Sequence, residues 1–74
     1  MVWIKIKNTL INLDNVTFVE KRSNKLIISP VIEIVTKSNE HAEQIYEIIT
    51  KAIELKNNFV DIDKLINVDE AIEF

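Results

Sequence analysis

The chain contains no glycine among its 74 residues, and this absence constrains every tight turn that it can make. Turns that need a left-handed backbone must use asparagine or another residue that tolerates this conformation. Turns are therefore expected at Asn8-Thr9, Asp14-Asn15 and Ser23-Asn24-Lys25. The same absence excludes P-loop and Rossmann motifs, because those loops need glycines to bring backbone amides against a phosphate.

Alternating apolar and polar residues predict strands on both sides of these turns. In residues 2–7 the valine and the isoleucines share one face, while Trp3, Lys5 and Lys7 share the other. Further strands are expected in residues 10–13, 16–22 and 26–36.

Residues 26–36 are the most β-prone segment, and Pro30 interrupts them. Proline cannot donate a hydrogen bond to a strand ladder. The segment is therefore either one edge strand that bends at Ser29-Pro30 or two strands that meet at a corner there.

A helix is expected to begin at Ser38, because a hydroxyl cap precedes Glu40 and Glu43 in the first turn. Asn57-Asn58 is the expected stop. Apolar residues recur between these points at helical spacing, at Ala42, Ile45, Ile48, Ile49, Ala52, Ile53 and Leu55.

The last segment is acidic and yet apolar. Residues 57–74 hold one lysine and five Asp or Glu, whereas the whole chain has a net charge of −3. We therefore expect an α+β domain in residues 1–58, with an antiparallel meander of three or four strands and one long helix packed on it. Residues 59–74 are expected to be an acidic amphipathic tail that docks on its own subunit or on a partner subunit.

The length of the chain limits its stability. A single domain of this size has a marginal core, and small folds usually add a disulfide, a metal or a second subunit. Cysteine is absent and His41 is the single histidine, which excludes disulfides and multi-histidine zinc sites. A homo-oligomer or a firmly docked tail is the remaining stabilisation, and no cofactor is expected.

No arrangement of residues predicts catalysis. His41 lies in the first turn of the expected helix, where a surface role is favoured, and no pattern pairs two carboxylates in a cleft. No apolar run reaches the length of a membrane span, and the first residues lack the pattern of a signal peptide. We therefore expect a non-enzymatic cytoplasmic protein that does not bind a membrane.

An alternative is a small accessory nucleic-acid-binding protein. An exposed aromatic residue among cations on a sheet can hold a single strand by stacking and phosphate contacts. The residues for this role are Trp3, Lys5, Lys7, Lys21, Arg22 and Lys25. The overall acidity of the chain disfavours this alternative, since non-specific binding needs a basic surface.

Three short stretches carry a resemblance to known proteins. These are Trp3-Ile4, then Ile11-Asn12-Leu13 with Val16, and then Ser38, Glu40 and Ala42. Over residues 3–53 the chain resembles small uncharacterised bacterial and phage-encoded proteins that have a Trp-Ile start, an Ile-Asn-Leu-x-x-Val segment and a Ser-x-Glu-x-Ala helix start. The resemblance implies a β-sheet-plus-helix domain and no known activity, and it transfers no catalytic residue.

The favoured function is a non-catalytic protein–protein interaction module that forms a homodimer, with use as a regulator or inhibitor. The apolar residues of the tail are the candidate interface. They are Val60, Ile62, Leu65, Ile66, Ile72 and Phe74.

Overall fold

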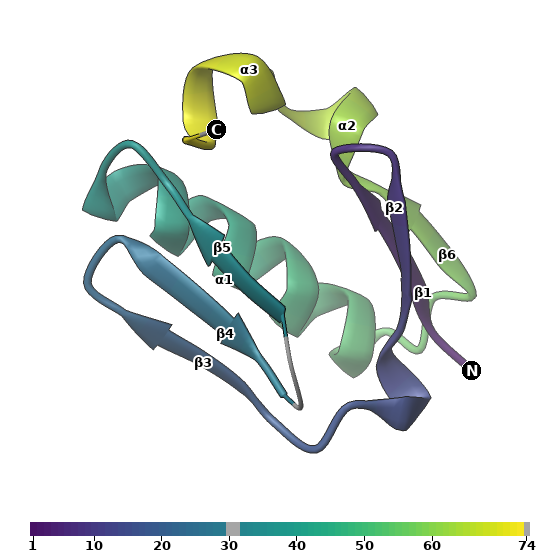
Figure 1. Ribbon diagram of the computed structural model, residues 1–74. Helices are drawn as coiled ribbons and strands as arrows, with labels where there is room; N and C mark the ends of the chain where they lie inside the picture. The colour runs from purple at the N-terminus through teal and green to yellow at the C-terminus, as the bar shows by residue number, and fades with distance from the viewer. Residues whose placement is uncertain (30–31, 74) are drawn as a thin grey trace.

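The computed structural model describes residues 1–29 and 32–73 (Figure 1). The strands are β1 (Trp3–Ile6), β2 (Thr9–Asn12), β3 (Val19–Arg22), β4 (Lys25–Ile28), β5 (Ile32–Val35) and β6 (Phe59–Asp61). The helices are the 3-10 turn η1 (Leu13–Asn15), the long helix α1 (Asn39–Glu54) and the short helices α2 (Ile62–Leu65) and α3 (Val68–Ala71). The predicted α+β class is confirmed.

The strands divide into two sheets of three strands each. In the first sheet β1 lies in the centre, antiparallel to β2 and parallel to β6. The second sheet is an antiparallel meander in the order β3–β4–β5. Figure 1 shows α1 behind the second sheet, with the first sheet beside them. The division occurs after β2, where η1 leads the chain away from the first sheet.

Residues 26–36 contain two paired strands. Leu26 of β4 lies opposite Ile34 of β5 in an antiparallel register. Of the two alternatives left open by the sequence, two strands is therefore the one observed, and they form a hairpin. The expected bend at Ser29-Pro30 falls partly outside the described residues, because Pro30 lies there.

Residues 59–73 contact the first sheet of the same chain through β6. The backbone N–H of Trp3 donates to the carbonyl oxygen of Asn58 at 3.0 Å, and β6 continues along β1 in parallel register. Ile62, at the start of α2, is completely buried in the core.

The same segment also reaches the second sheet. The N–H of Lys37 donates to the carbonyl oxygen of Ala71, and the N–H of Glu73 donates to that of Val35, each at 2.8 Å. Ile72 lies opposite Thr36 in an isolated antiparallel bridge and is 2% exposed. Figure 1 shows α2 and α3 crossing from β6 towards β5. Residues 59–73 therefore connect the two sheets.

Helix α1 begins where the sequence predicts. The Ser38 hydroxyl oxygen accepts a hydrogen bond from the backbone N–H of His41, as an N-cap should. Ala42, Ile45, Ile49 and Ala52 are buried on one side of the helix. They join buried side chains from both sheets in one hydrophobic core. No helix among the described residues has the length and hydropathy needed to cross a bilayer.

Thr36 is the one polar residue among the buried residues described, and it is completely buried. Its hydroxyl oxygen lies 2.6 Å from the carbonyl oxygen of Asn24 and 2.7 Å from that of Ser38. The Asn24 side-chain amide in turn donates to the Thr36 carbonyl oxygen. These bonds satisfy the buried hydroxyl and fix the β3–β4 turn, the end of β5 and the start of α1 to one another.

Four described residues have positive φ, and none is glycine. They are Lys7 (50°), Asn8 (60°), Ser23 (56°) and Lys56 (54°). The first two form the β1–β2 turn, where positive φ at both central residues matches the right-handed twist of a hairpin. The prediction of turns built without glycine is confirmed at Ser23-Asn24 and at the β1–β2 turn. The β1–β2 turn is formed by Lys7 and Asn8, one residue earlier than the expected Asn8-Thr9.

Lys56 ends α1 in a Schellman motif. Its N–H donates to the carbonyl oxygen of Ile53, and the N–H of Asn57 donates to that of Ala52. Glycine is the usual residue at this left-handed position, because a Cβ atom there costs about 1–2 kcal/mol. The C-terminal end of α1 is therefore a place where the absence of glycine lowers stability.

We expect Lys56→Gly to raise the free energy of unfolding by about 0.5–1 kcal/mol, since the relief of strain exceeds the added entropy of the unfolded chain. Lys51→Gly is the matched control, because Lys51 is exposed on the same helix with helical backbone. It should lower the free energy of unfolding by about 1 kcal/mol. Urea denaturation measures the free energy of unfolding of both variants. Equal losses in the two variants would contradict the assignment of backbone strain to Lys56.

Candidate functional site

One side of the first sheet faces away from the core. Alternation along the strands places every second residue on this side, and the strand register aligns them across the sheet. We call this surface the Trp3 face. It consists of Trp3, Lys5, Leu10, Asn12, Phe59 and Asp61.

Three large apolar side chains lie on the Trp3 face. Phe59 is next to Trp3 on the adjacent parallel strand, and Leu10 is one position diagonal to Trp3 on the other neighbour. Such diagonal neighbours are about 7–8 Å apart, within reach of an aromatic side chain. Trp3 is half-buried, but Leu10 is 59% exposed and Phe59 52% exposed. The three side chains thus form an apolar patch across β2, β1 and β6 that water reaches.

Lys5 neutralises acidic groups at the edge of this patch. Its Nζ lies 3.9 Å from Asp61 Oδ2 and 3.8 Å from Asp63 Oδ2. The lysine is on β1 and both aspartates belong to the acidic segment after residue 57. The acidic residues after position 57 are therefore partly neutralised by ion pairs with a lysine of the N-terminal strand.

The Asp63 carboxylate has a second role. One oxygen accepts the backbone N–H of Lys7 at 2.6 Å, and the other accepts that of Asn8 at 3.0 Å. Both donors belong to the β1–β2 turn, whose left-handed backbone leaves these two N–H groups pointing out of the hairpin. A carboxylate that receives two backbone N–H bonds makes strong, charge-assisted contacts.

Asp61 is less well satisfied than Asp63. Its Oδ1 is buried and has no hydrogen-bond partner among the described residues. Its other oxygen, Oδ2, lies 3.9 Å from Lys5 Nζ. An unsatisfied buried acceptor has a cost in stability, so Asp61 and Asp63 should differ sharply in what they contribute.

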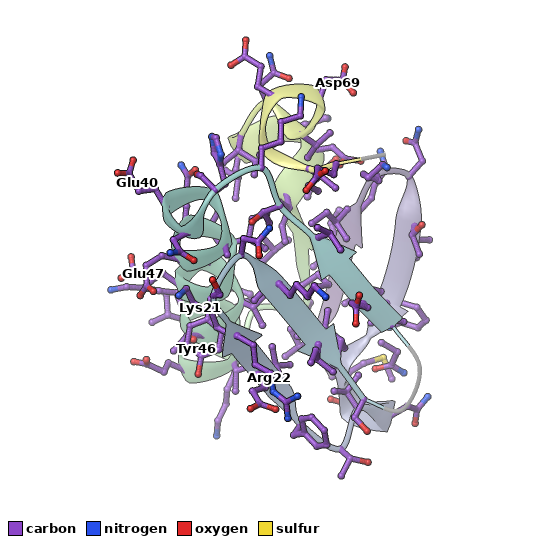
Figure 2. All side chains as sticks on the ribbon, turned by 60° about the vertical axis from the view of Figure 1, so that its left-hand side comes forward. Lys21, Arg22, Glu40, Tyr46, Glu47 and Asp69 are labelled. Atoms are coloured by element: carbon purple, nitrogen blue, oxygen red, sulfur yellow. The ribbon has the colours of Figure 1, made fainter. Side chains whose placement is uncertain are left out.

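The second cluster of cations, Lys21, Arg22 and Lys25, lies on the other sheet. Lys21 faces α1 and its Nζ is 3.6 Å from Glu43 (Figure 2). Arg22 and Lys25 point to the opposite side of the sheet. The structure therefore does not bring the six residues of the nucleic-acid alternative together. Trp3 and Lys5 lie on the Trp3 face, and the other three cations lie on the two sides of the second sheet. Lys7 does not share the face of Trp3 and Lys5, as expected from the alternation, because β1 ends at Ile6 and Lys7 takes a left-handed backbone in the β1–β2 turn.

The cations on the outer side of the second sheet are paired. Arg22 Nε donates to Glu20 Oε2 at 2.9 Å, and this hydrogen bond raises the pKa of the exposed arginine. Lys25 Nζ lies 4.0 Å from Glu33 Oε1. This outer side therefore carries four charged side chains, unlike the Trp3 face.

The candidate interface residues of the tail have different surroundings. Ile62 and Ile72 belong to the chain's own core. Val60 and Ile66 are partly buried against it, and Leu65 is 60% exposed. Phe74 lies outside the described residues. Of the five that are described, Leu65 is thus the one that a partner can reach most easily.

His41 makes a local contact with its cap residue. Its Nδ1 lies 2.9 Å from the Ser38 hydroxyl oxygen. Two acidic residues of the same helix, Glu40 and Glu47, project from its outer side (Figure 2). No group of three or more His, Cys, Asp or Glu side chains in the described part of the chain could hold a metal ion.

Sequence reasoning missed Leu10 and Phe59 as surface residues. Leu10 is predictable in hindsight, because a two-residue turn at Lys7-Asn8 places it opposite Lys5. Phe59 is harder to place, because the sequence contains no local signal that pairs β6 with a strand more than fifty residues away. The period-two spacing of Val60 and Ile62 was the available hint.

Comparison with known proteins finds no family model, no curated protein and no solved structure that the chain matches.

We expect Asp63→Ala to lower the free energy of unfolding by about 1.5–3 kcal/mol, because it removes two charge-assisted hydrogen bonds to the β1–β2 turn. Asp61→Ala is the matched control, since Asp61 lies at almost the same distance from Lys5. It should cost less than about 1 kcal/mol. Urea denaturation of the two variants makes the comparison, and losses of the same size would show that the turn contacts are unimportant.

Proposed function

We propose that the protein is a non-catalytic protein–protein interaction module that forms a homodimer through the Trp3 face. The observation that carries this proposal is the exposed patch of Leu10 and Phe59 on either side of Trp3. Exposed apolar groups that gather on one face mark interaction surfaces more often than scattered ones do.

The contrast between the two sheets supports this choice of surface. The outer side of the second sheet carries Glu20, Arg22, Lys25 and Glu33, which suit contact with water. The Trp3 face carries two charged residues, Lys5 and Asp61, which already pair with each other. A second subunit would therefore cover this face at a smaller desolvation cost than it would the other.

We favour a second copy of the chain as the partner that covers the Trp3 face. A 74-residue chain without cysteine has a marginal core, and a partner subunit supplies the missing apolar burial. The paired charges of the face also let two copies approach without strong like-charge repulsion. A standard interface covers about 800 Å² per partner, which is roughly one-sixth of the 4784 Å² that the chain exposes.

The alternative function, nucleic-acid binding, draws on the same face. Trp3 could stack on a base, but Lys5 is held by Asp61 and Asp63. A phosphate would have to compete with these two carboxylates. We therefore place this alternative second.

We expect the wild-type protein to have twice the mass of one chain in sedimentation equilibrium at micromolar to millimolar concentrations. Leu10→Thr and Phe59→Thr should each raise the dimer dissociation constant at least tenfold, since burying one such side chain contributes about 1.5–3 kcal/mol. Leu65→Gln is the control, because Leu65 is equally exposed but lies off this face. Its dissociation constant should stay within about threefold of the wild type.

Two outcomes would count against this proposal. A monomeric mass at every concentration would exclude the homodimer, and an equal effect of Leu65→Gln would exclude the Trp3 face as the interface. A monomer that shifts a single-stranded oligonucleotide in a salt-dependent way, with the shift lost in Trp3→Ala, would favour the alternative.

A further inference from the structure

Residues 59–73 form a segment that the rest of the chain receives through specific contacts. Their strand β6 pairs with β1, Asp63 accepts two N–H groups of the β1–β2 turn, and Ile72 bridges Thr36. Ile62 and Ile72 also add buried apolar surface to the core. These partners all precede α1 in the chain. The contacts therefore depend on where residues 59–73 lie, and not on which copy of the chain supplies them.

A short exposed hinge connects this segment to the long helix. It consists of residues 55–58, between the end of α1 and the start of β6, and all four are exposed (Figure 1). The hinge reverses the chain through Lys56, whose φ of 54° is left-handed. A lysine is strained in this region because its Cβ crowds the backbone. Short hinges under strain favour exchange of the attached segment between copies, since opening the hinge removes the strain.

The hinge residues also suit an open form. Leucine and lysine are good helix formers, so α1 can continue through Leu55 and Lys56. The backbone of Lys56 then becomes helical. Leu55 is 67% exposed in the closed chain. In an exchanged pair the two hinges run past each other, so the two Leu55 side chains can bury part of their surface together.

We propose that two copies of the chain exchange residues 59–73 by straightening of the hinge, so that β6, α2 and α3 of each copy pack on the two sheets of the other. The contacts of the segment are kept, and the strain at both hinges is lost. Phe59 and Asp61 of the Trp3 face then come from the second copy. This inference goes beyond the proposed homodimer, because it holds whether or not the Trp3 face is an interface.

Exchange of the segment should be slow. Residues 59–73 have to leave both sheets before they can enter another copy, and this removes Ile62 and Ile72 from the core. The exchanged dimer should therefore form when the chain refolds at high concentration, and it should persist after dilution. A dimer through the Trp3 face needs no opening of the fold, so dilution should dissociate it promptly.

The first experiment is refolding from urea at two protein concentrations. It uses Leu10→Thr, which removes a contact of the Trp3 face and leaves the exchanged contacts intact, because β2 does not pair with β6. Samples refolded at about 1 mM and at about 10 µM are both brought to about 10 µM and sedimented at once. The first should contain a dimer that declines over hours, and the second should contain monomer.

Variants of the hinge, made in the same background, test the role of strain. Lys56→Gly should raise the dissociation constant of the exchanged dimer about fivefold or more, because glycine relieves the closed form and disfavours the helix of the open form. Lys56→Val should lower this constant, since a β-branched residue is rarely left-handed. Lys51→Gly is the matched control, because Lys51 is helical in both forms, and its constant should change by less than about twofold.

An engineered disulfide identifies the exchange itself. Val35→Cys together with Glu73→Cys places two cysteines opposite each other, because Ile72 and Thr36 pair at the adjacent position. Opposite residues of antiparallel strands have Cα atoms about 5.5 Å apart, which a disulfide can bridge. The natural chain has no cysteine. After oxidation, denaturing electrophoresis without reductant should show single chains from refolding at about 10 µM and covalent dimers from refolding at about 1 mM.

Three results would overturn the inference. They are the absence of a slowly dissociating dimer after refolding at the higher concentration; a dimer whose disulfides all lie within single chains; and equal dissociation constants for Lys56→Gly and Lys51→Gly. The two proposals fail separately. A wild-type dimer that dissociates promptly and has no disulfide between chains rejects only the exchange, and a slow covalent dimer without a prompt one rejects only the Trp3 face.

Discussion

The structure depends on the pairing of residues 59–73 with both sheets. A chain of 74 residues has too little core to hold two separate three-stranded sheets unless something joins them. The join is made through β6 on β1 at one side and the Ile72 bridge to Thr36 at the other. Asp63 strengthens the first contact by accepting two N–H groups of the β1–β2 turn. The acidic charge of the segment is thus a structural feature of the domain.

This arrangement determines which surfaces remain for a partner. The segment uses Ile62 and Ile72 in the core, and it leaves the outer side of β1 partly accessible to solvent. The Trp3 face is therefore a consequence of this connection.

The sequence was most informative where the determinants were local. Ser38 predicted the helix start through its cap, and the alternation of residues 2–7 predicted which side of β1 is buried. The pairing of β6 with β1 had no local determinant, because parallel strands need a long crossover and leave no turn signature. The exposed patch could not be predicted without that pairing, because Phe59 reaches the side of Trp3 only through the register of β6.

Native-state hydrogen exchange tests the central claim most directly, because it measures the free energy of opening at single amides. The N–H of Lys37 is held by Ala71, and the N–H of Trp3 is held by Asn58. If residues 59–73 are an integral part of the fold, both amides should exchange within about 1 kcal/mol of the free energy of global unfolding, as is expected of the amides of the central strand β4. Exchange of both at several kcal/mol below the β4 amides would show that the segment detaches while the two sheets persist, and it would contradict the account.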